Sequence, residues 1–168
     1  MNWESKLAKL RGLEGEREEL AIIFGSAPSA SAEALDAIRR DVAGVPAEYI
    51  DFLRQTDGLQ IDMNVLAGSG GSGFPSLKRL DARWRPVIGE RGGCVVGEDA
   101  AGAAFLVTPS GAISLVDADP PHRVRTIASS FEEFLGEVLL GPRYQDLFPN
   151  GLYEGNEWWP LLRAEGWA

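Results

Sequence analysis

The residues whose types and order suggest a reaction are Ser69, Asp117 and His122. Ser69 lies in "AGSGG", which has the Ala-x-Ser-x-Gly form of a nucleophile elbow, and an acid and the only histidine follow in the order of a hydrolase triad. An elbow needs a helix directly after the serine, whereas glycines and then Pro75 follow here. Asp117 and His122 also flank what reads as one tight turn. A small serine hydrolase using Ser69 therefore stays an alternative and is not the preferred function.

Two other patterns suggest a cofactor or a metal ion. The stretch 68–73, "GSGGSG", satisfies G-x-G-x-x-G, but a dinucleotide site needs a strand–loop–helix crossover and the chain around it reads as antiparallel. The acid pairs Glu98 with Asp99 and Asp117 with Asp119 offer oxygen ligands, and hard cations need several oxygens that converge from a defined loop. No third ligand stands in register with either pair. We therefore predict neither a cofactor nor a metal site.

The stretch 78–91, "KRLDARWRPVIGER", holds five of the 16 basic residues around Trp84. Basic residues beside an aromatic ring are one signature of nucleic-acid binding. Asp81 and Glu90 interrupt the stretch, and the whole chain carries a formal net charge of −9. Nucleic acids and anionic membranes both reward positive charge, so we predict a local salt-bridged surface and neither of these partners. The acidic balance favours a basic partner.

The length and composition predict one soluble domain. A chain of 168 residues with 45% hydrophobic residues is long enough to bury a substantial core. The single cysteine, Cys94, excludes an intramolecular disulfide, and its apolar surroundings predict a buried core residue. Glu4 interrupts the N-terminal stretch, which does not read as a secretory signal, and no apolar run approaches the roughly 20 residues of a membrane span. We expect a cytoplasmic protein.

The residue patterns in the first part of the chain predict helices followed by a strand. Apolar spacing predicts helices over 2–11, within an N-terminal helical segment 1–24, and over 31–42. In "VPAEYIDFLRQTDGL" (45–59), Pro46 suits a first helical position, an apolar stripe follows, and Gly58 suits the left-handed conformation that ends helices. The alternating residues of "LQIDMNVL" then predict one strand with a wet face.

The remaining chain reads as a β-meander, a helix and a docked tail. The glycine-rich stretch 67–74 predicts a flexible loop. Four β-type runs with short turns, from "CVVGED" to "HRVRTIA", predict antiparallel strands. Ser130 and Glu133 form the pattern of a helix capping box, and the aromatic tail 141–168 is expected to dock on the core. The prediction is a single α+β domain over 1–168, with helices packed on a mostly antiparallel sheet of about four to six strands.

Three of these stretches together resemble the SUKH superfamily, the Smi/Knr-type domain of fungal cell-wall regulators and bacterial toxin-immunity proteins. They are the proline-led helix "VPAEYIDFLRQTDGL", the hairpin "CVVGEDAAGAAFLVTPSGAISLVDAD", and "VRTIASSFEEFL", which looks like a strand leading into a Ser-Phe-x-x-Phe-Leu helix. The tail "EWWPLLRAEGW" is also like that of some members. The residues that carry the resemblance are Pro46, Tyr49, Phe52, Leu53, Gly58, Ser130, Phe131, Phe134, Leu135, Trp158 and Trp159. The stretch "AGSGGSG" and Asp57, where asparagine is frequent, depart from the family pattern.

The resemblance implies an α+β fold without catalytic residues, and for bacterial members an immunity protein that binds a toxin, often a nuclease, and blocks it. From charge and turn position we predict that the partner contacts an acidic face made of Asp57, Asp62, Glu98, Asp99, Asp117 and Asp119. The expected partner is a protein, possibly a basic toxin domain. A regulatory scaffold for another protein partner is the alternative from the same fold.

Overall fold

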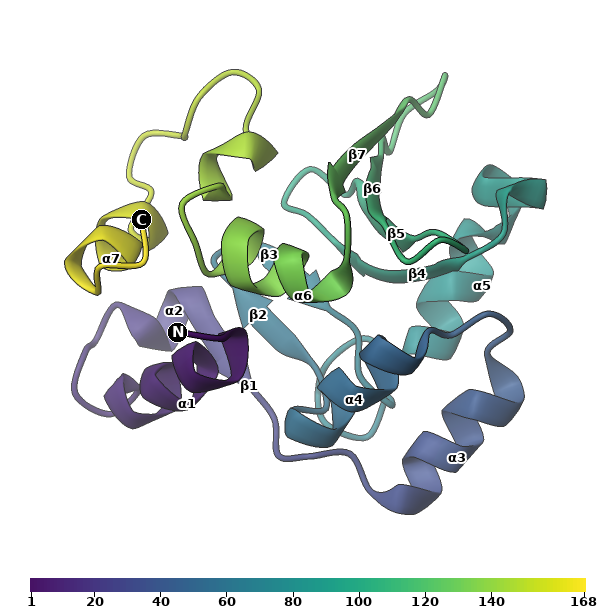
Figure 1. Ribbon diagram of the computed structural model, residues 1–168, viewed down its shortest axis with the longest axis horizontal. Helices are drawn as coiled ribbons and strands as arrows, with labels where there is room; N and C mark the ends of the chain where they lie inside the picture. Colours follow the sequence, from purple (N-terminus) through teal and green to yellow (C-terminus); the bar gives the residue numbers. More distant parts are fainter.

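The computed structural model describes residues 1–168 and contains one antiparallel sheet of seven strands that follow one another in chain order (Figure 1). The α+β prediction is confirmed, with more strands than the four to six expected. The strands are β1 (Phe24–Ser26), β2 (Leu59–Ile61), β3 (Asn64–Leu66), β4 (Cys94–Glu98), β5 (Ala104–Val107), β6 (Ile113–Val116) and β7 (Val124–Ala128). The α-helices are α1 (Trp3–Leu13), α2 (Leu20–Ile23), α3 (Ala32–Asp41), α4 (Ala47–Gln55), α5 (Leu77–Ile88), α6 (Phe131–Glu133) and α7 (Trp158–Ala164).

Residues 59–66 form a hairpin, so the prediction of one continuous strand is wrong. Ile61 pairs with Asn64, and the two residues between them make the turn. Asp62 takes a left-handed conformation there, with φ of 53°, which aspartate tolerates better than most residues. The alternation of apolar and polar residues continues through the turn, which hides the turn from a period-two reading. Asn64 and Leu66 are consequently buried, and Met63 is exposed.

Helix α4 is held against the sheet by its aromatic face. Tyr49 and Phe52 are fully buried, and the Tyr49 hydroxyl donates to the backbone carbonyls of Ala67 and Val96 at 2.5 and 3.0 Å. Pro46 lies one position earlier than predicted, as the N-cap. Gly58 has the expected positive φ, at 107°, but the helix already ends at Gln55. Gly58 instead turns the chain into β2, where a side chain would collide with Phe74.

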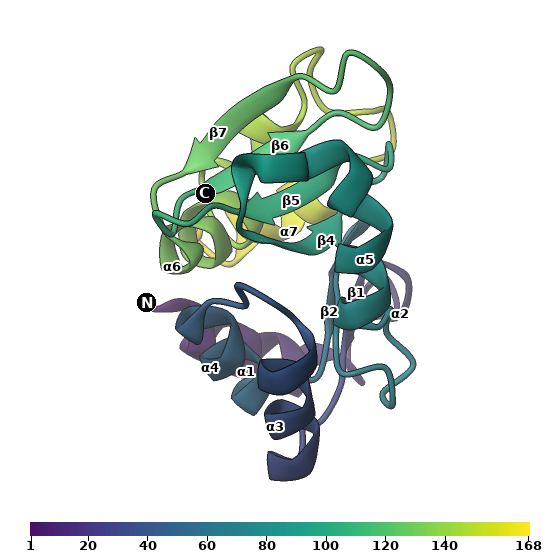
Figure 2. The same cartoon turned by 90° about the vertical axis from the view of Figure 1, so that its right-hand side faces the viewer.

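The four strands predicted in the second half are β4 to β7, and they pair as the predicted antiparallel meander. Helix α5 covers one face of the meander (Figure 2), and Trp84 on that helix donates to Glu98 on β4 at 2.8 Å. Helix α5 was not predicted from the sequence. On the opposite face Phe105 of β5 packs on Phe134, with ring centroids 4.9 Å apart. Three of the five basic residues in 78–91 form ion pairs, as predicted for a salt-bridged surface.

The helix after β7 begins at the predicted cap. The Ser130 hydroxyl accepts from the Glu133 amide at 3.1 Å, whereas the Glu133 carboxylate binds the backbone N–H and hydroxyl of Ser129 and not those of Ser130. After one α-helical turn the chain continues as a π-helix, η2 (Phe134–Leu139), and later as a 3₁₀ turn, η3 (Tyr144–Leu147). This helical stretch supplies the platform on which both ends of the chain are packed.

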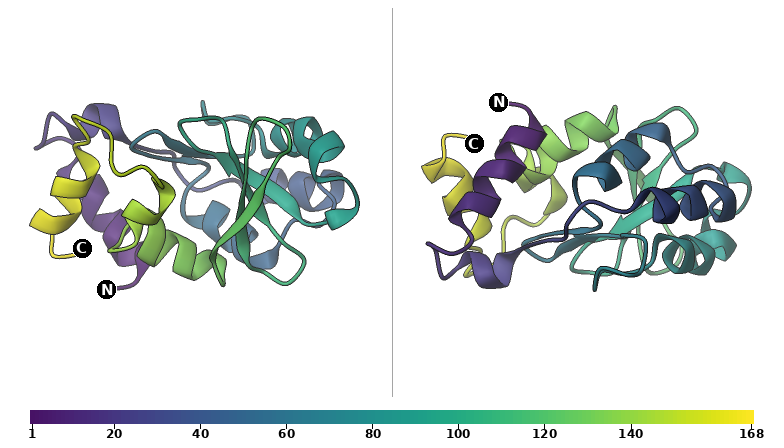
Figure 3. Two further views of the ribbon diagram at one scale, coloured as in Figure 1. Left: turned by 90° about the horizontal axis from the view of Figure 1, so that it is seen from above. Right: turned by 90° about the horizontal axis from the view of Figure 1, so that it is seen from below.

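The N-terminal and C-terminal segments lie side by side at one end of the molecule (Figure 3). Lys6 on α1 is buried and donates to the carbonyls of Gly136 and Leu140 at 2.9 and 2.8 Å. Trp158 is fully buried and donates to Leu139 O at 2.9 Å. One hydrophobic core runs through the helices, the sheet and the tail. None of the helices is both long and apolar enough to cross a lipid bilayer.

Candidate functional site

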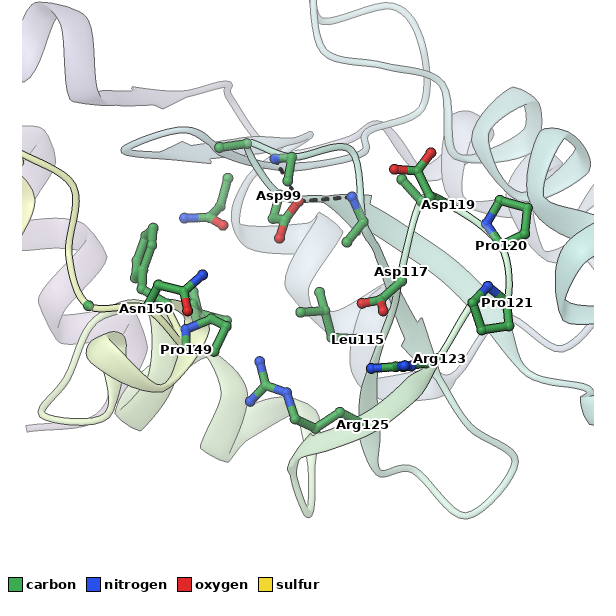
Figure 4. A pocket seen from close by; sticks show the side chains of 18 residues that line it. Asp99, Leu115, Asp117, Asp119, Pro120, Pro121, Arg123, Arg125, Pro149 and Asn150 are labelled. Carbon is green, nitrogen blue, oxygen red and sulfur yellow. Dashed lines mark hydrogen bonds between the residues drawn. The ribbon is translucent and has the colours of Figure 1, made fainter.

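A hollow of about 680 Å³ lies between the sheet and the C-terminal segment (Figure 4). Its walls are the turn that joins β4 to β5, the turn that joins β6 to β7, the exposed half of β7, and residues 147–151. Leu115 on β6 and Phe148 on the C-terminal segment contribute apolar lining. Ligand pockets in proteins usually have volumes of roughly 300–1,000 Å³, so the hollow is large enough to receive a side chain or a short segment of a partner.

Three of the six acidic residues predicted to bind a partner line this hollow: Asp99, Asp117 and Asp119. Asp99 caps its own turn, because one carboxylate oxygen, Oδ1, accepts from the backbone N–H groups of Ala101 and Ala103 at 2.9 and 2.8 Å. Asp117 and Asp119 are exposed. In Figure 4 the Asp117 carboxylate points into the hollow and Asp119 lies on its rim. The two turns thus bring three carboxylates from separate parts of the chain to one surface.

Two arginines face these carboxylates: Arg125 on β7 and Arg123 directly before that strand. Arg123 and Arg125 alternate with Val124, so their side chains lie on the same face of the strand and both line the hollow (Figure 4). Arg125 donates to the backbone carbonyl of Asp146 at 3.0 Å, which joins β7 to η3. Neither arginine was predicted from the sequence as a site residue. The period-two spacing in "HRVRTIA" was the available signal, since it predicts two cations on one face of a strand.

Asp57 is not on an exposed acidic face, which corrects the prediction for this residue. Its side chain is 7% exposed and accepts from the backbone N–H and the hydroxyl of Ser69, at 2.5 and 2.6 Å. The Asp57 carbonyl accepts from the Ser72 hydroxyl, and a side chain on Gly68 would collide with that same carbonyl. Asp57 therefore anchors the glycine-rich segment 67–74, because its carboxylate accepts from both the N–H and the hydroxyl of Ser69.

Asp62 is also buried, at 2% exposure, so its predicted place on a partner surface is wrong. Its carboxylate accepts from the hydroxyls of Tyr144 and Tyr153 and from the Asn156 side-chain amide, the last at 2.9 Å. Burial, followed by the hydrogen bond to Asp62, raises the pKa of Tyr153 to about 12. We call these four residues the tail clasp. The left-handed conformation of Asp62 directs its carboxylate into the protein. Three side-chain donors of the C-terminal segment then bind the carboxylate oxygens.

Glu98 points away from the hollow, although it precedes Asp99 directly. Successive side chains of a strand lie on opposite faces, and Glu98 faces α5. There its Oε1 accepts from Arg83 at 2.6 Å and from the Trp84 ring N–H at 2.8 Å. The structure therefore divides the six predicted acids into three that share the hollow and three that support the fold.

The residues of the alternative hydrolase triad, Ser69, Asp117 and His122, do not form a triad in the structure. The Ser69 hydroxyl is bound to Asp57. Nδ1 of His122 lies 3.0 Å from the backbone carbonyl of Asp117, within their own turn. Ser69 lies away from His122: it lines a separate depression beside α5, together with Arg79. No cluster of three or more histidine, cysteine, aspartate or glutamate side chains has the arrangement of a metal site.

Comparison with known proteins gave no match: no protein-family model matches the chain, and no curated protein matches it significantly.

Proposed function

We propose that the chain is a SUKH-type protein-binding domain that acts without catalysis, as an immunity-type protein in the cytoplasm that occludes the active site of a basic toxin. The antiparallel meander, its flanking helices and the Ser130-capped helix agree with the fold that the resemblance implies. The observation that carries the proposal is the gathering of Asp99, Asp117 and Asp119 around one hollow, while the other three predicted acids are occupied by structural contacts.

The mechanism combines electrostatic steering with steric occlusion. A chain of net charge −9 attracts a basic partner from beyond contact distance, which raises the association rate more than the final affinity. The three carboxylates then accept hydrogen bonds from lysine or arginine side chains that enter the hollow. A nuclease presents such side chains where it binds phosphates, so a domain that occupies them excludes the nucleic acid.

The test is capture of the partner on the immobilised full chain from the lysate of its own source, eluted with a salt gradient and identified by mass spectrometry. Wild-type protein is compared with the triple variant Asp99→Asn, Asp117→Asn, Asp119→Asn, in which asparagine preserves the oxygen that caps the Asp99 turn. The matched control replaces three exposed glutamates of the N-terminal segment, Glu14, Glu16 and Glu18, with glutamine. Both variants remove three negative charges, so only the position of the charges differs.

We expect one basic toxin domain to be captured in stoichiometric yield and released by salt, with the hollow variant at least about tenfold weaker than the control variant. Equal weakening in the two variants would show that the hollow has no special role. Capture that resists high salt, with a partner that is not a toxin, would favour the regulatory scaffold. The arginines in the same hollow favour that alternative, because a purely basic surface would be repelled by Arg123 and Arg125.

A further inference from the structure

The outer edge of β7 carries backbone groups that no other strand uses. The Asp117 N–H donates to Arg123 O at 2.9 Å, and Leu115 stands opposite Arg125 two positions along. In an antiparallel ladder, every second residue of a strand directs its N–H and C=O groups toward the paired strand. The residues between them direct these groups to the opposite side. Val124 and Thr126 therefore direct their N–H and C=O groups outward. β7 is the last strand of the sheet, so this side has no neighbour.

Most of this edge is uncovered, and its protection is limited to one bulged and covered end and to the charges of Arg123 and Arg125. Val124, Arg125 and Thr126 are all exposed, Val124 with 42% of its surface, and the strand contains no proline. The one irregularity of the pairing lies beyond Thr126, where the Arg143 guanidinium donates to the free carbonyl of Ile127 at 2.8 Å. Natural edge strands are usually covered, bulged, blocked by proline or lined with charged side chains. Here the Ile127 end is covered and the stretch before it is open.

Arg125 on β7 and Arg123 directly before it determine which strand of a partner can pair with this edge. Arg123 and Arg125 face the hollow, and an added strand would place every second side chain beside them on that same face. Arg123 takes part in no ion pair, and the one side-chain bond of Arg125 goes to a backbone carbonyl. Directly opposed charges of opposite sign stabilise a strand pair, and like charges destabilise it. Carboxylates spaced two residues apart match this edge, whereas a second copy of β7 would oppose arginine to arginine.

We infer that β7 is a docking edge for an extended segment of a partner protein, which adds an eighth strand to the sheet and places acidic side chains, two residues apart, beside Arg123 and Arg125. The main-chain bonds to Val124 and Thr126 supply general affinity, and the two arginines supply the selection for acidic residues. The inference goes beyond the proposed function, because it holds whether or not the partner is a toxin.

The probe is the blocked peptide acetyl-Thr-Glu-Val-Glu-Val-Thr-amide, followed on the full chain by NMR of the backbone amides. We expect the Val124 and Thr126 amide signals to shift selectively and their hydrogen exchange to slow. The analogue with lysine in place of both glutamates should bind about tenfold more weakly, because it sets like charges opposite the arginines. Absent shifts at millimolar peptide, shifts spread over the whole spectrum, or equal binding of the two peptides would overturn the inference.

Two variants separate strand addition from simple charge attraction. Thr126→Pro removes an outward N–H that β6 does not use, and Thr126→Val keeps it, so the proline variant should lose peptide binding and the valine variant should retain it. Arg123→Glu keeps the backbone edge intact and should abolish the preference between the two peptides, because a carboxylate at position 123 offsets Arg125. This result keeps the inference falsifiable if the proline variant unfolds. Unchanged binding by a folded Thr126→Pro variant would refute the inference. Failure of toxin capture would leave these results unaffected.

Discussion

Replacing Asp62 with asparagine tests whether the tail clasp stabilises the fold as the structure indicates. Asparagine is nearly the same size and tolerates the left-handed backbone at this position, so the change isolates the carboxylate charge. Asp62 accepts three hydrogen bonds, and a bond to a charged acceptor contributes about 1.5–3 kcal/mol. Asparagine keeps one acceptor oxygen and turns an N–H group toward the tyrosines. We therefore expect the free energy of unfolding to fall by about 2–4 kcal/mol.

Urea unfolding followed by tryptophan fluorescence measures this loss, because the buried Trp158 lies in the clasped tail. The matched control is Asp51→Asn, an exposed acid paired with Arg54 on the surface, where the loss should stay below about 1 kcal/mol. A double-mutant cycle of Asp62→Asn with Tyr144→Phe should give a coupling energy of about 1 kcal/mol or more. If Asp62→Asn is no more destabilising than the Asp51 control, the clasp does not stabilise the protein and the reasoning fails.

Three further outcomes are expected. Burial and Asp62 raise the pKa values of Tyr144 and Tyr153, the latter to about 12. Their contribution to stability is therefore complete below pH 10 and falls as the pH rises above about 10, up to about pH 12 for Tyr153 and further for Tyr144. Urea unfolding at a series of alkaline pH values measures this fall. Burial raises the pKa of the Cys94 thiol to about 12, and an aromatic disulfide reagent should therefore label it only after unfolding; rapid labelling of native protein would contradict its burial. Ser69→Ala should lower the free energy of unfolding by about 1–2 kcal/mol through the lost bond to Asp57 and leave partner capture unchanged, whereas a hydrolase would lose its activity.

The elements that the sequence predicted correctly are those whose signals are local. The four β-type runs of the second half have turn residues between them, and Ser130 stands directly before its helix, so each element can be recognised from its own residues. The strand expected over 59–66 failed because alternation is the same on both sides of a two-residue turn. Helix α5 was not predicted because the basic residues of this stretch favour an interpretation by charge. Its buried residues Leu77, Leu80, Trp84 and Ile88 nevertheless have helical spacing.

The candidate site was predicted only in part, because exposure depends on contacts between distant residues. Asp57 and Asp62 lie beside turns, where a charge is normally solvated. Their carboxylates are buried because donors arrive from far along the chain: Asn156, for instance, is separated from Asp62 by 94 positions. No sequence pattern near residue 62 predicts hydrogen-bond donors from the C-terminal segment. Asp99, Asp117 and Asp119 lie on turns that connect neighbouring strands of one meander, and turns at the same end of adjacent hairpins necessarily come close together.

The order of the strands has a consequence for how the protein is made. Each strand pairs with one that was synthesised earlier, and the widest separation within the sheet is between Phe24 and Ile61. Pairing between chain neighbours closes short loops at low entropic cost, so the sheet can assemble in sequence while translation continues. The wall formed by residues 147–151 is synthesised only after every strand, and the clasp on Asp62 waits for Asn156. The complete hollow can therefore form only after every strand has been synthesised.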